Sequence, residues 1–598
     1  MPSQREPTAS GTETRRTIGA LGRAWFEWLR RDSGPLALFA VATAVMTWPI
    51  VANLDGLWLA SHDDDTYAKL WDNWWVATHA FPELSFTRSD LLFHPIGLDL
   101  SYHSISWTVA SASATLGTVV DRVVAYNLSI LVAVFGNAYG AYLLIRTMVD
   151  QRAGAIFGGL VYGFAPYALT QSGGHPDLAH LFPIPLTALL TIQAIERASV
   201  GRAVAASLML SLATFTSLYI MVFTILTVGP LALHGALTRQ RWCTAGFWRV
   251  ALAFGVVCAV TLAIRLTPIF FDGDGLSFAI ESKYRADSRQ TDLLSLVTPP
   301  RFHPVFGPLV AKVTAAFGMN RKWPAYLGAL PLLLTLFALA RSTARARVVL
   351  WFSIGVGFVL LSLGPVLRLN GHVYDSIPLP GAFVAWLPPI RAVGRPDYFM
   401  LGALLPLAVC AALGLDRFLR DRSRRTVAVL ATAGCALLLF EYSNGPYRGA
   451  LLEASPFHQT LRAEPNGGAL IDLPMGREPS KRYMYLQSIH GRPIAEGISG
   501  RMPANAYRYV DANYLLSHWK RGVHPPCGAA SLAKTAAALD GLALDGFRFV
   551  VVHHDRLSPT SPFAKRLRPR PHFQDKFLTV YQLEELRAAP PCRPRRAD

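Results

Sequence analysis

Apolar stretches of about twenty residues alternate with shorter polar segments along most of the chain. Each stretch is close to the length that an α-helix needs to cross the hydrocarbon layer of a bilayer. Eleven of them lie near residues 35–54, 124–148, 154–172, 178–196, 203–217, 219–237, 248–267, 323–340, 348–366, 396–415 and 426–442. The pattern therefore predicts an all-α polytopic membrane protein with about eleven transmembrane helices.

The segments that connect these stretches alternate in character. Every second connector is short and basic, and the others are longer and rich in proline, histidine, aromatic residues and carboxylates. Because short basic loops stay in the cytoplasm, we expect a cytoplasmic amino terminus (1–34), a membrane domain (35–442) and a first outer loop at 55–123. The sequence thus predicts a multi-pass protein of the cell membrane.

Residues 443–598 have the composition of a small soluble α/β domain. Runs typical of strands lie at 469–473, 548–552 and 578–582, and helical segments lie around 480–489, 504–518 and 530–543. This domain follows the last predicted span, so we expect it to be extracytoplasmic. It contains Cys527 and Cys592, which an oxidising compartment would allow to form a disulfide.

Composition and charge narrow the range of functions. The 598 residues are 52% hydrophobic and 16% charged, against about 25% charged in soluble domains. The net charge of +18 comes from short basic clusters between apolar stretches, so we expect no nucleic-acid partner. The sequence has no Walker loop, dinucleotide fingerprint or nucleophile elbow. A site for cytoplasmic nucleotide sugars would also need a soluble domain inside, and the sequence predicts none. We therefore expect substrates at the outer face or within the bilayer, with an activated donor carried by a lipid.

Three consecutive carboxylates, Asp63, Asp64 and Asp65, follow the first apolar stretch. Like charges this close repel one another, so such a cluster usually holds a cation, a phosphate or a substrate hydroxyl. Each of the three carboxylates is a candidate catalytic base. Lys69, one helical turn after Asp65, is a candidate for substrate binding and would keep a nearby carboxylate ionised to act as that base. Asp63 and Asp65 are alternatively ligands for Mg²⁺ or Mn²⁺, and Asp63 or Asp64 can simply cap a helix.

Residues 62–80 predict a helix that lies along the membrane surface. Leu70 and Trp74 fall on one face of it, with Trp71 and Trp75 alongside. Amphipathic helices rich in tryptophan suit the headgroup level of a bilayer.

Two further sets of polar residues lie in predicted outer connectors. His175, Asp177 and His180 follow a pair of glycines at a turn between two spans, where ionisable groups are functional candidates. The alternative is a helix cap with interfacial histidines. Arg391 and Arg395 flank a glycine at the mouth of a span and suit the recognition of a lipid phosphate. Ordinary anchoring to headgroups is the alternative for this pair.

Several short motifs in roughly the first 330 residues resemble those of a known family of proteins. Their order along the chain and their positions relative to the predicted spans both match. The motifs are Asp65-x5-Trp71-x3-Trp75, Leu91-Leu-Phe-His-Pro-Ile-Gly97, Gly158-Gly-Leu-Val-Tyr-Gly-Phe-Ala-Pro166, Gly174-His175 with Pro185-Leu186, and Ala325-Tyr-Leu-Gly328. The chain resembles the GT-C superfamily of polyprenyl-phosphate-sugar-dependent glycosyltransferases. More closely, it is similar to bacterial family-39-like proteins, which are often described as dolichyl-phosphate-mannose-protein-mannosyltransferase-like.

The resemblance implies an inverting transfer of a hexosyl or pentosyl group in cell-envelope glycan assembly. Asp64 or Asp65 would deprotonate a hydroxyl of a glycan, lipid or protein acceptor, which attacks the anomeric carbon and expels a polyprenyl phosphate. His94, within one of the motifs, would contribute to substrate binding. Two other functions remain open at this point: a lipid-linked glycan transporter or flippase, and a non-catalytic glycan-binding scaffold on the same fold.

Overall fold

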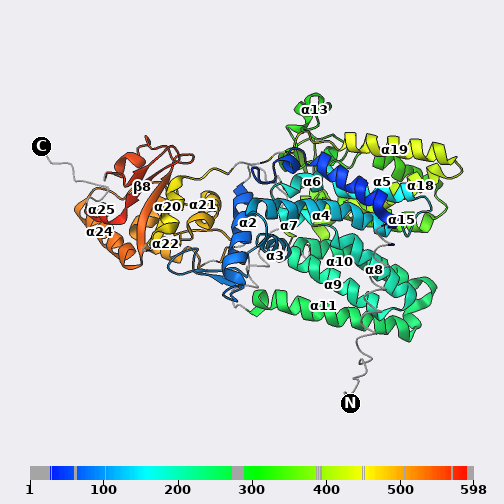
Figure 1. Ribbon diagram of the computed structural model, residues 1–598, viewed down its shortest axis with the longest axis horizontal. Helices are drawn as coiled ribbons and strands as arrows, with labels where there is room; N and C mark the ends of the chain where they lie inside the picture. Colours follow the sequence, from blue (N-terminus) through cyan, green and yellow to red (C-terminus); the bar gives the residue numbers. More distant parts are fainter. Residues whose placement is uncertain are drawn as a thin grey trace, which may run out of the picture.

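The molecule has a bundle of long helices at one end and an α/β region at the other (Figure 1). This computed structural model describes residues 27, 30–59, 64–101, 103–271, 289–384, 387, 390, 393–447, 449, 452–465, 467–500, 502–503, 505–567 and 570–588. The predicted sites at Asp63, Arg391 and Cys592 lie outside these residues.

A helix lies on each of the eleven predicted apolar stretches. They are residues 30–46, α4 (Arg122–Ile145), α5 (Arg152–Phe164) with α6 (Pro166–Ser172), α7 (Pro176–Ala179) with α8 (Pro183–Arg197), α9 (Val200–Thr216), α10 (Leu218–Leu237), α11 (Ala245–Phe271), α14 (Ala329–Arg341), α15 (Arg345–Ser362), α18 (Met400–Leu419) and α19 (Arg424–Glu441). Hydrophobic periodicity therefore located the helices correctly.

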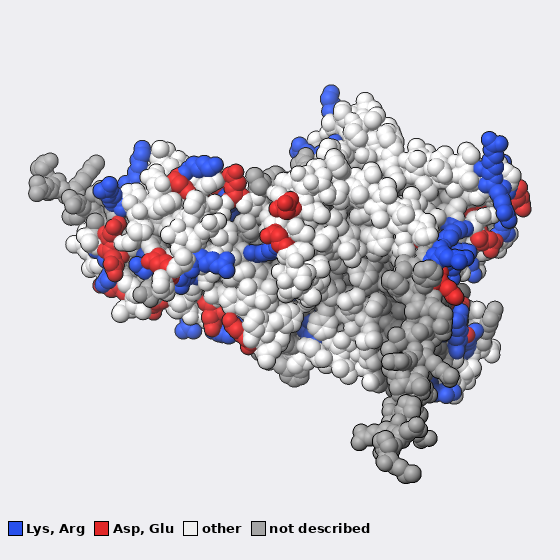
Figure 2. Space-filling view, in the orientation of Figure 1, with Lys and Arg blue, Asp and Glu red and all other residues white. Residues whose placement is uncertain are grey.

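Within the described residues, six helices are long and apolar enough to cross a membrane, or seven if the bent pair α5–α6 is one span. The helices α9 and α14 are apolar but shorter, and the count of eleven spans stays a prediction. On the face in Figure 2, charged side chains gather on the α/β region and at the opposite end of the helices, and the broad belt between them is almost uncharged. This is the surface of a multi-pass membrane protein.

The bundle is built around α18. The apolar 18-residue segment of α18 is fully buried inside the protein, whereas only 6% of the corresponding segment of α11, at the edge of the bundle, is buried. Small residues let the helices approach α18 closely. A β-carbon at Gly158 of α5 would lie 3.0 Å from the carbonyl oxygen of Ala408. A β-carbon at Gly414 would collide with the backbone of Leu334 in α14. Larger residues at these glycines would push α5 and α14 away from α18.

The segments between the spans form short elements beside the bundle. They are η1 (Ile50–Ala52), α2 (Asp64–Trp75), η2 (Val76–Ala80), β1 (Arg88–Ser89), β2 (Leu98–Asp99), α3 (Trp107–Leu116), η3 (Thr238–Cys243), η4 (Leu293–Leu296), α13 (Gly307–Thr314), η5 (Gly318–Arg321), β3 (Val366–Leu369), β4 (His372–Pro378), α16 (Pro380–Val384) and η6 (Pro396–Phe399).

The predicted surface helix at 62–80 exists as α2 and η2, but its environment differs from the prediction. Trp71 and Trp75 are fully buried, and the Trp71 indole donates a hydrogen bond of 2.7 Å to the Gln487 side chain. The tryptophans stack on one another inside the protein rather than facing headgroups. The reason is that residues from the distant α/β region cover this face of α2.

The α/β region contains α20 (Pro456–Ala463), β5 (Ala469–Leu473), α21 (Arg477–His490), α22 (Arg508–Ala512), α23 (Tyr514–Lys520), α24 (Ala529–Leu544), β6 (Phe547–His553), η7 (Ala564–Arg566), β7 (Phe573–Gln574), β8 (Leu578–Gln582) and α25 (Leu583–Ala588). The sheet order is β5-β6-β8-β7. The pair β5–β6 is parallel and the other pairs are antiparallel. The predicted strands coincide with β5, β6 and β8. Cys527 is disulfide-bonded, and its pairing with Cys592 stays a prediction.

Both faces of this sheet are buried. Successive side chains of a strand point to opposite faces, and nearly all residues of β5 and β6 are buried. Phe549 and Val551 of β6 belong to the same core as the bundle, whereas Val550 and Val552 pack with α23 and α24 in a second core. The helix α21 lies against α2 and joins the two parts. Arg122 at the start of α4 strengthens this junction by donating to the Ser488 hydroxyl at 3.2 Å.

Two buried histidines stack within the α/β region, between α20 and α21. The rings of His458 and His490 have centroids 5.5 Å apart, and neither ring nitrogen of His458 has a hydrogen-bond partner among the described residues. Burial lowers the pKa of His458 from 6.5 to about 3, and burial also lowers the pKa of His490. Both rings are therefore neutral in the folded protein near pH 7.

We expect acid to destabilise the α/β region through His458. Below pH 6.5 the unfolded chain binds a proton that the buried ring cannot accept, so the free energy of unfolding falls as the pH drops. The expected loss is about 2 kcal/mol between pH 7 and pH 5. Hydrogen exchange of β5, corrected for intrinsic rates, measures it in the full-length protein. The His458→Leu variant should show a weaker pH dependence, and an unchanged dependence would contradict this assignment.

Candidate active site

The Asp65 carboxylate lies in the first turn of α2, where the helical bundle meets the α/β region. Its Oδ1 atom is 2.7 Å from the Lys481 ammonium of α21, and its Oδ2 atom is 3.8 Å from Nε2 of His175. The side chain of Asp65 remains 34% exposed, whereas those of Lys481 and His175 are 9% and 12% exposed. A carboxylate held by two nearly buried partners thus presents one side to solvent.

The environment of Asp65 keeps this carboxylate ionised. Burial alone would raise its pKa, but the neighbouring His175 and Lys481 together lower the pKa below its usual value. Burial also lowers the pKa of His175, so this ring is mostly neutral near pH 7, and the charge beside Asp65 that persists at this pH is that of Lys481. The pKa of Lys481 is raised, because its attraction to Asp65 and Glu478 outweighs its burial.

The sequence brings His175 to Asp65 through a break between two helices. Pro166 begins α6 and holds the preceding residue in an extended conformation, so α6 bends by 46° from α5. The glycine turn that follows ends at His175. The Thr66 hydroxyl of α2 donates to the Gly173 carbonyl at 3.2 Å and ties this turn to the helix that carries Asp65.

Arg395 supports His175 from the other side. Its guanidinium donates to both carboxylate oxygens of Asp397, at 3.2 and 2.8 Å, and to the Tyr398 hydroxyl at 3.0 Å. The Tyr398 hydroxyl is 3.4 Å from Nε2 of His175, and Trp323 packs against both His175 and Arg395. Burial opposes the charge of Arg395, but Tyr398 and Asp397 raise its pKa overall. Most N–H groups of Arg395 therefore already donate hydrogen bonds, and they hold Asp397 and Tyr398 in place.

Lys69 lies in a second, buried cluster beneath α2. Its ammonium donates to the Ser104 carbonyl and hydroxyl and lies 3.3 Å from Asp72 Oδ2, while His103 Nε2 is 2.6 Å from Asp72 Oδ1. Burial opposes the charge of Lys69, yet Asp72 raises its pKa overall. Lys69 therefore binds the following loop to α2.

The remaining predicted site residues have hydrogen-bond partners other than Asp65 or lie outside the described residues. Asp177 still acts on His175, because its charge opposes the lowering of the His175 pKa by burial. Asp177 accepts a hydrogen bond of 3.2 Å from Ser217, and His180 Nδ1 lies 2.9 Å from the Pro176 carbonyl. His94 Nε2 lies 2.7 Å from the Asp545 carbonyl, so it joins the first outer loop to the α/β region. Asp64 begins α2, but its side chain lies outside the described residues.

The structure therefore brings together three of the predicted residues, Asp65, His175 and Arg395. Sequence reasoning missed Lys481, Tyr398 and Trp323. The run Arg395-Pro-Asp-Tyr398 carries a local signal, because it gathers an arginine, an acid and a tyrosine at the start of a predicted span. Lys481 carries no local signal, because only the docking of α21 places it beside Asp65.

A metal ion at Asp65 would need further ligands close to this carboxylate. No group of three or more His, Cys, Asp or Glu residues among the described side chains is arranged to hold a metal ion. The ammonium of Lys481 also takes one oxygen of Asp65. The described residues thus supply no complete ligand set at Asp65. The assignment of Asp63 and Asp65 as ligands for Mg²⁺ or Mn²⁺ stays a prediction, because Asp63 lies outside them.

Comparison with solved structures identifies the fold. The chain superimposes on arabinofuranosyltransferase AftD from mycobacteria with a TM-score of 0.55 and 15% identity, covering 93% of this chain and 41% of AftD. It superimposes on ArnT from Cupriavidus metallidurans with a TM-score of 0.50 and 13% identity, covering 94% of this chain and all of ArnT. The chain therefore has the GT-C fold of membrane glycosyltransferases, which the sequence resemblance predicted.

The chain thus spans less than half of the length of AftD, and identities this low establish the fold alone. No curated protein matches the sequence. A family does match, over residues 36–441, which include the helical bundle except the first residues of its first helix. The chain belongs to the family described as Domain of unknown function (DUF6311).

Proposed function

We propose that this protein is an integral-membrane glycosyltransferase that moves a sugar from a polyprenyl-phosphate carrier to a hydroxyl acceptor. The observation that carries the proposal is the Asp65 carboxylate, which is ionised and partly exposed on a GT-C fold. A general base must be charged, reachable and held in place. Asp65 meets these three requirements.

In the proposed reaction Asp65 removes the proton from the acceptor hydroxyl. The oxygen attacks the anomeric carbon of the donor, a new glycosidic bond forms with inversion, and the bond to the polyprenyl phosphate breaks. The phosphate leaves with the bonding electrons, and the proton stays on Asp65 until solvent takes it. The donor sugar is a hexosyl or pentosyl group, and the acceptor is a glycan, a lipid or a protein.

Lys481 and His175 have positioning roles in this proposal. Lys481 fixes one oxygen of Asp65, at 2.7 Å, and leaves the other available to a substrate proton. Neutral His175 borders this second oxygen at 3.8 Å, and the Tyr398 hydroxyl lies 3.4 Å from the same Nε2 atom and holds the ring in place. Arg395 holds Tyr398 and Asp397 in place. We propose this organising role for Arg395 instead of the direct phosphate contact that the sequence suggested.

We place the reaction at the outer face of the cell membrane, in cell-envelope glycan assembly. The basic connectors support a cytoplasmic amino terminus and an extracytoplasmic α/β region. With this orientation, the pair Asp65–Lys481 lies where the α/β region meets the outer ends of the spans. A carrier with its chain in the bilayer and its sugar outside would bring the anomeric carbon to this level.

Replacing the base should remove most of the transfer activity without unfolding the protein, because Glu478 remains as a partner for the Lys481 charge at 2.6 Å. We expect Asp65→Asn to lower the rate about 100-fold or more, the usual range for loss of a general base. The assay follows labelled polyprenyl-phosphate sugars and extracted envelope acceptors with purified protein. Asp90→Asn is a matched control, because Asp90 is an exposed carboxylate of the same outer loop that pairs with Arg88. Wild-type transfer by Asp65→Asn would refute the proposed base.

Removing the Lys481 charge should change the pH at which the base is protonated. Burial raises the pKa of Asp65 and Lys481 opposes this effect. In Lys481→Met the acidic limb of the kcat/KM profile should therefore move to higher pH. Lys481→Arg should keep the limb near its wild-type position. The control Lys534→Met removes an exposed lysine of α24. A profile unchanged in Lys481→Met would show that Lys481 is only structural.

A further inference from the structure

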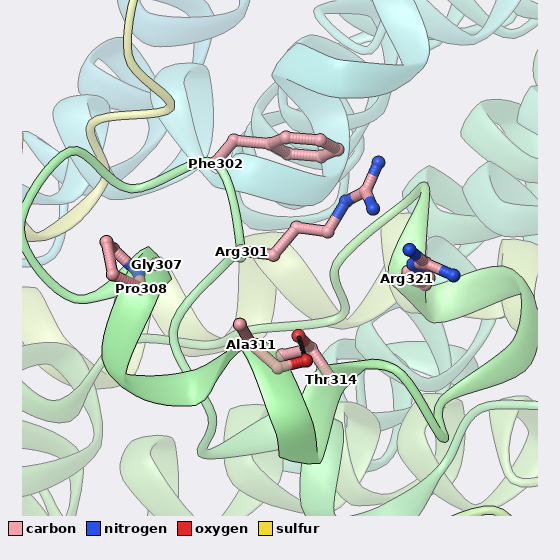
Figure 3. A pocket seen from close by; sticks show the side chains of 7 residues that line it. All are labelled: Arg301, Phe302, Gly307, Pro308, Ala311, Thr314 and Arg321. Atoms are coloured by element: carbon pink, nitrogen blue, oxygen red, sulfur yellow. Dashed lines mark hydrogen bonds between the residues drawn. The ribbon is translucent and has the colours of Figure 1, made fainter.

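The helix α13 projects sideways from the bundle, near the end of α19 that faces the α/β region (Figure 1). A cavity of about 420 Å³ opens between this helix, the loop before it and η5. Arg301 and Arg321 line it together with Phe302, Gly307 and Thr314. Figure 3 shows both guanidinium groups on the same side of the cavity. None of the residues of the Asp65 site lines it.

The loop that carries Arg301 is held rigidly. His303 Nδ1 accepts hydrogen bonds from the backbone of Val305 and Phe306, at 3.1 and 3.0 Å, and its Nε2 donates to the Phe440 carbonyl at 2.8 Å. A β-carbon at Gly307 would collide with the Arg301 carbonyl, so the loop packs directly on the start of α13. The position of Arg301 is thus set before any ligand arrives.

The position of Arg321 is set by a separate network. Arg321 ends η5, and the side chain of the preceding Asn320 bonds to the backbone of Asp292 and of Trp323, at 2.8 and 3.3 Å. The Arg301 guanidinium lies 4.7 Å from the centre of the Phe302 ring. None of the described residues lining the cavity is acidic. Two permanent positive charges therefore share one cavity wall, and arginine is well suited to phosphate oxygens.

The surface of α13 and of the residues before it is largely apolar beside this basic cavity, with Lys312 as its exposed charge. Leu309 is 78% exposed, and Val305 and Val313 are also exposed. In Figure 2 this part of the surface borders the almost uncharged belt of the bundle. Exposed aliphatic side chains next to arginines match a ligand that has an anionic group and a hydrocarbon chain. A small water-soluble anion would make no contact with this apolar surface, so the surface would not contribute to its binding.

We propose that the cavity at α13 binds the phosphate group of a membrane lipid, at a site separate from Asp65. Arg301 and Arg321 contact the phosphate oxygens, and Val305, Leu309 and Val313 contact the hydrocarbon chain at the level where headgroups meet the bilayer interior. The inference does not depend on the glycosyltransferase proposal, because it uses none of the residues around Asp65.

The test is native mass spectrometry of the purified full-length protein in detergent, titrated with dioleoylphosphatidylglycerol. The double variant Arg301→Gln/Arg321→Gln should bind the lipid about tenfold or more weakly than the wild type, which corresponds to the loss of charged hydrogen bonds. Lys312→Gln is the matched control, because Lys312 is exposed on α13 and does not line the cavity. It should bind within about twofold of the wild type.

Two further arms identify the source of the phosphate. Undecaprenyl phosphate is titrated in place of phosphatidylglycerol, and tighter binding that needs both arginines would assign the site to a carrier lipid. Inorganic phosphate is added as a competitor, and displacement of the lipid at equal concentration would overturn the lipid assignment. Equal lipid binding by the wild type and the double variant would overturn the site itself. Arg321→Gln alone changes an exposed residue and gives the same reading if the double variant does not fold.

Discussion

The ion pair between Asp65 and Lys481 connects the two parts of the molecule and sets the chemistry of the proposed site. The lysine is nearly buried, and a buried charge without a partner is costly. Lys481 belongs to α21 and Asp65 to α2, so the 2.7 Å contact forms only when α21 is correctly docked on α2. The hydrogen bonds from Trp71 to Gln487 and from Arg122 to Ser488 fix the same junction. Separating the parts would leave Asp65 without the cation that keeps its pKa low.

The path of the membrane helices supplies the opposite side of the site. The bend between α5 and α6 directs the glycine turn toward α2, and the turn ends at His175. The start of α18 brings Arg395, Asp397 and Tyr398 to the same place through η6. The bent pair α5–α6, the start of α18 and the docked helix α21 therefore meet around Asp65. Irregular backbone at the ends of spans is found where polar groups must be held near a bilayer.

Sequence reasoning predicted the parts of this protein that depend on local patterns. Apolar stretches located the helices, and runs of β-branched and aromatic residues located β5, β6 and β8. The candidate site was only partly predictable. Asp65, His175 and Arg395 are recognisable by their residue types and positions. The roles of Arg395 and Lys69 depend on contacts with Asp397 and Ser104, which the spacing of residues in the sequence does not show. Lys481 and the burial of Trp71 come from contacts between distant segments, which periodicity cannot detect.

The sheet of the α/β region shows that composition and packing divide this chain differently. The sequence changes character near residue 443, yet Phe549 and Val551 share a core that extends through α21 to the tryptophans of α2. Cutting the chain at that change would expose apolar surface on both fragments. The carboxy-terminal segment is therefore no interchangeable module, because grafting it onto another bundle would require remaking the surface of α2 on that bundle.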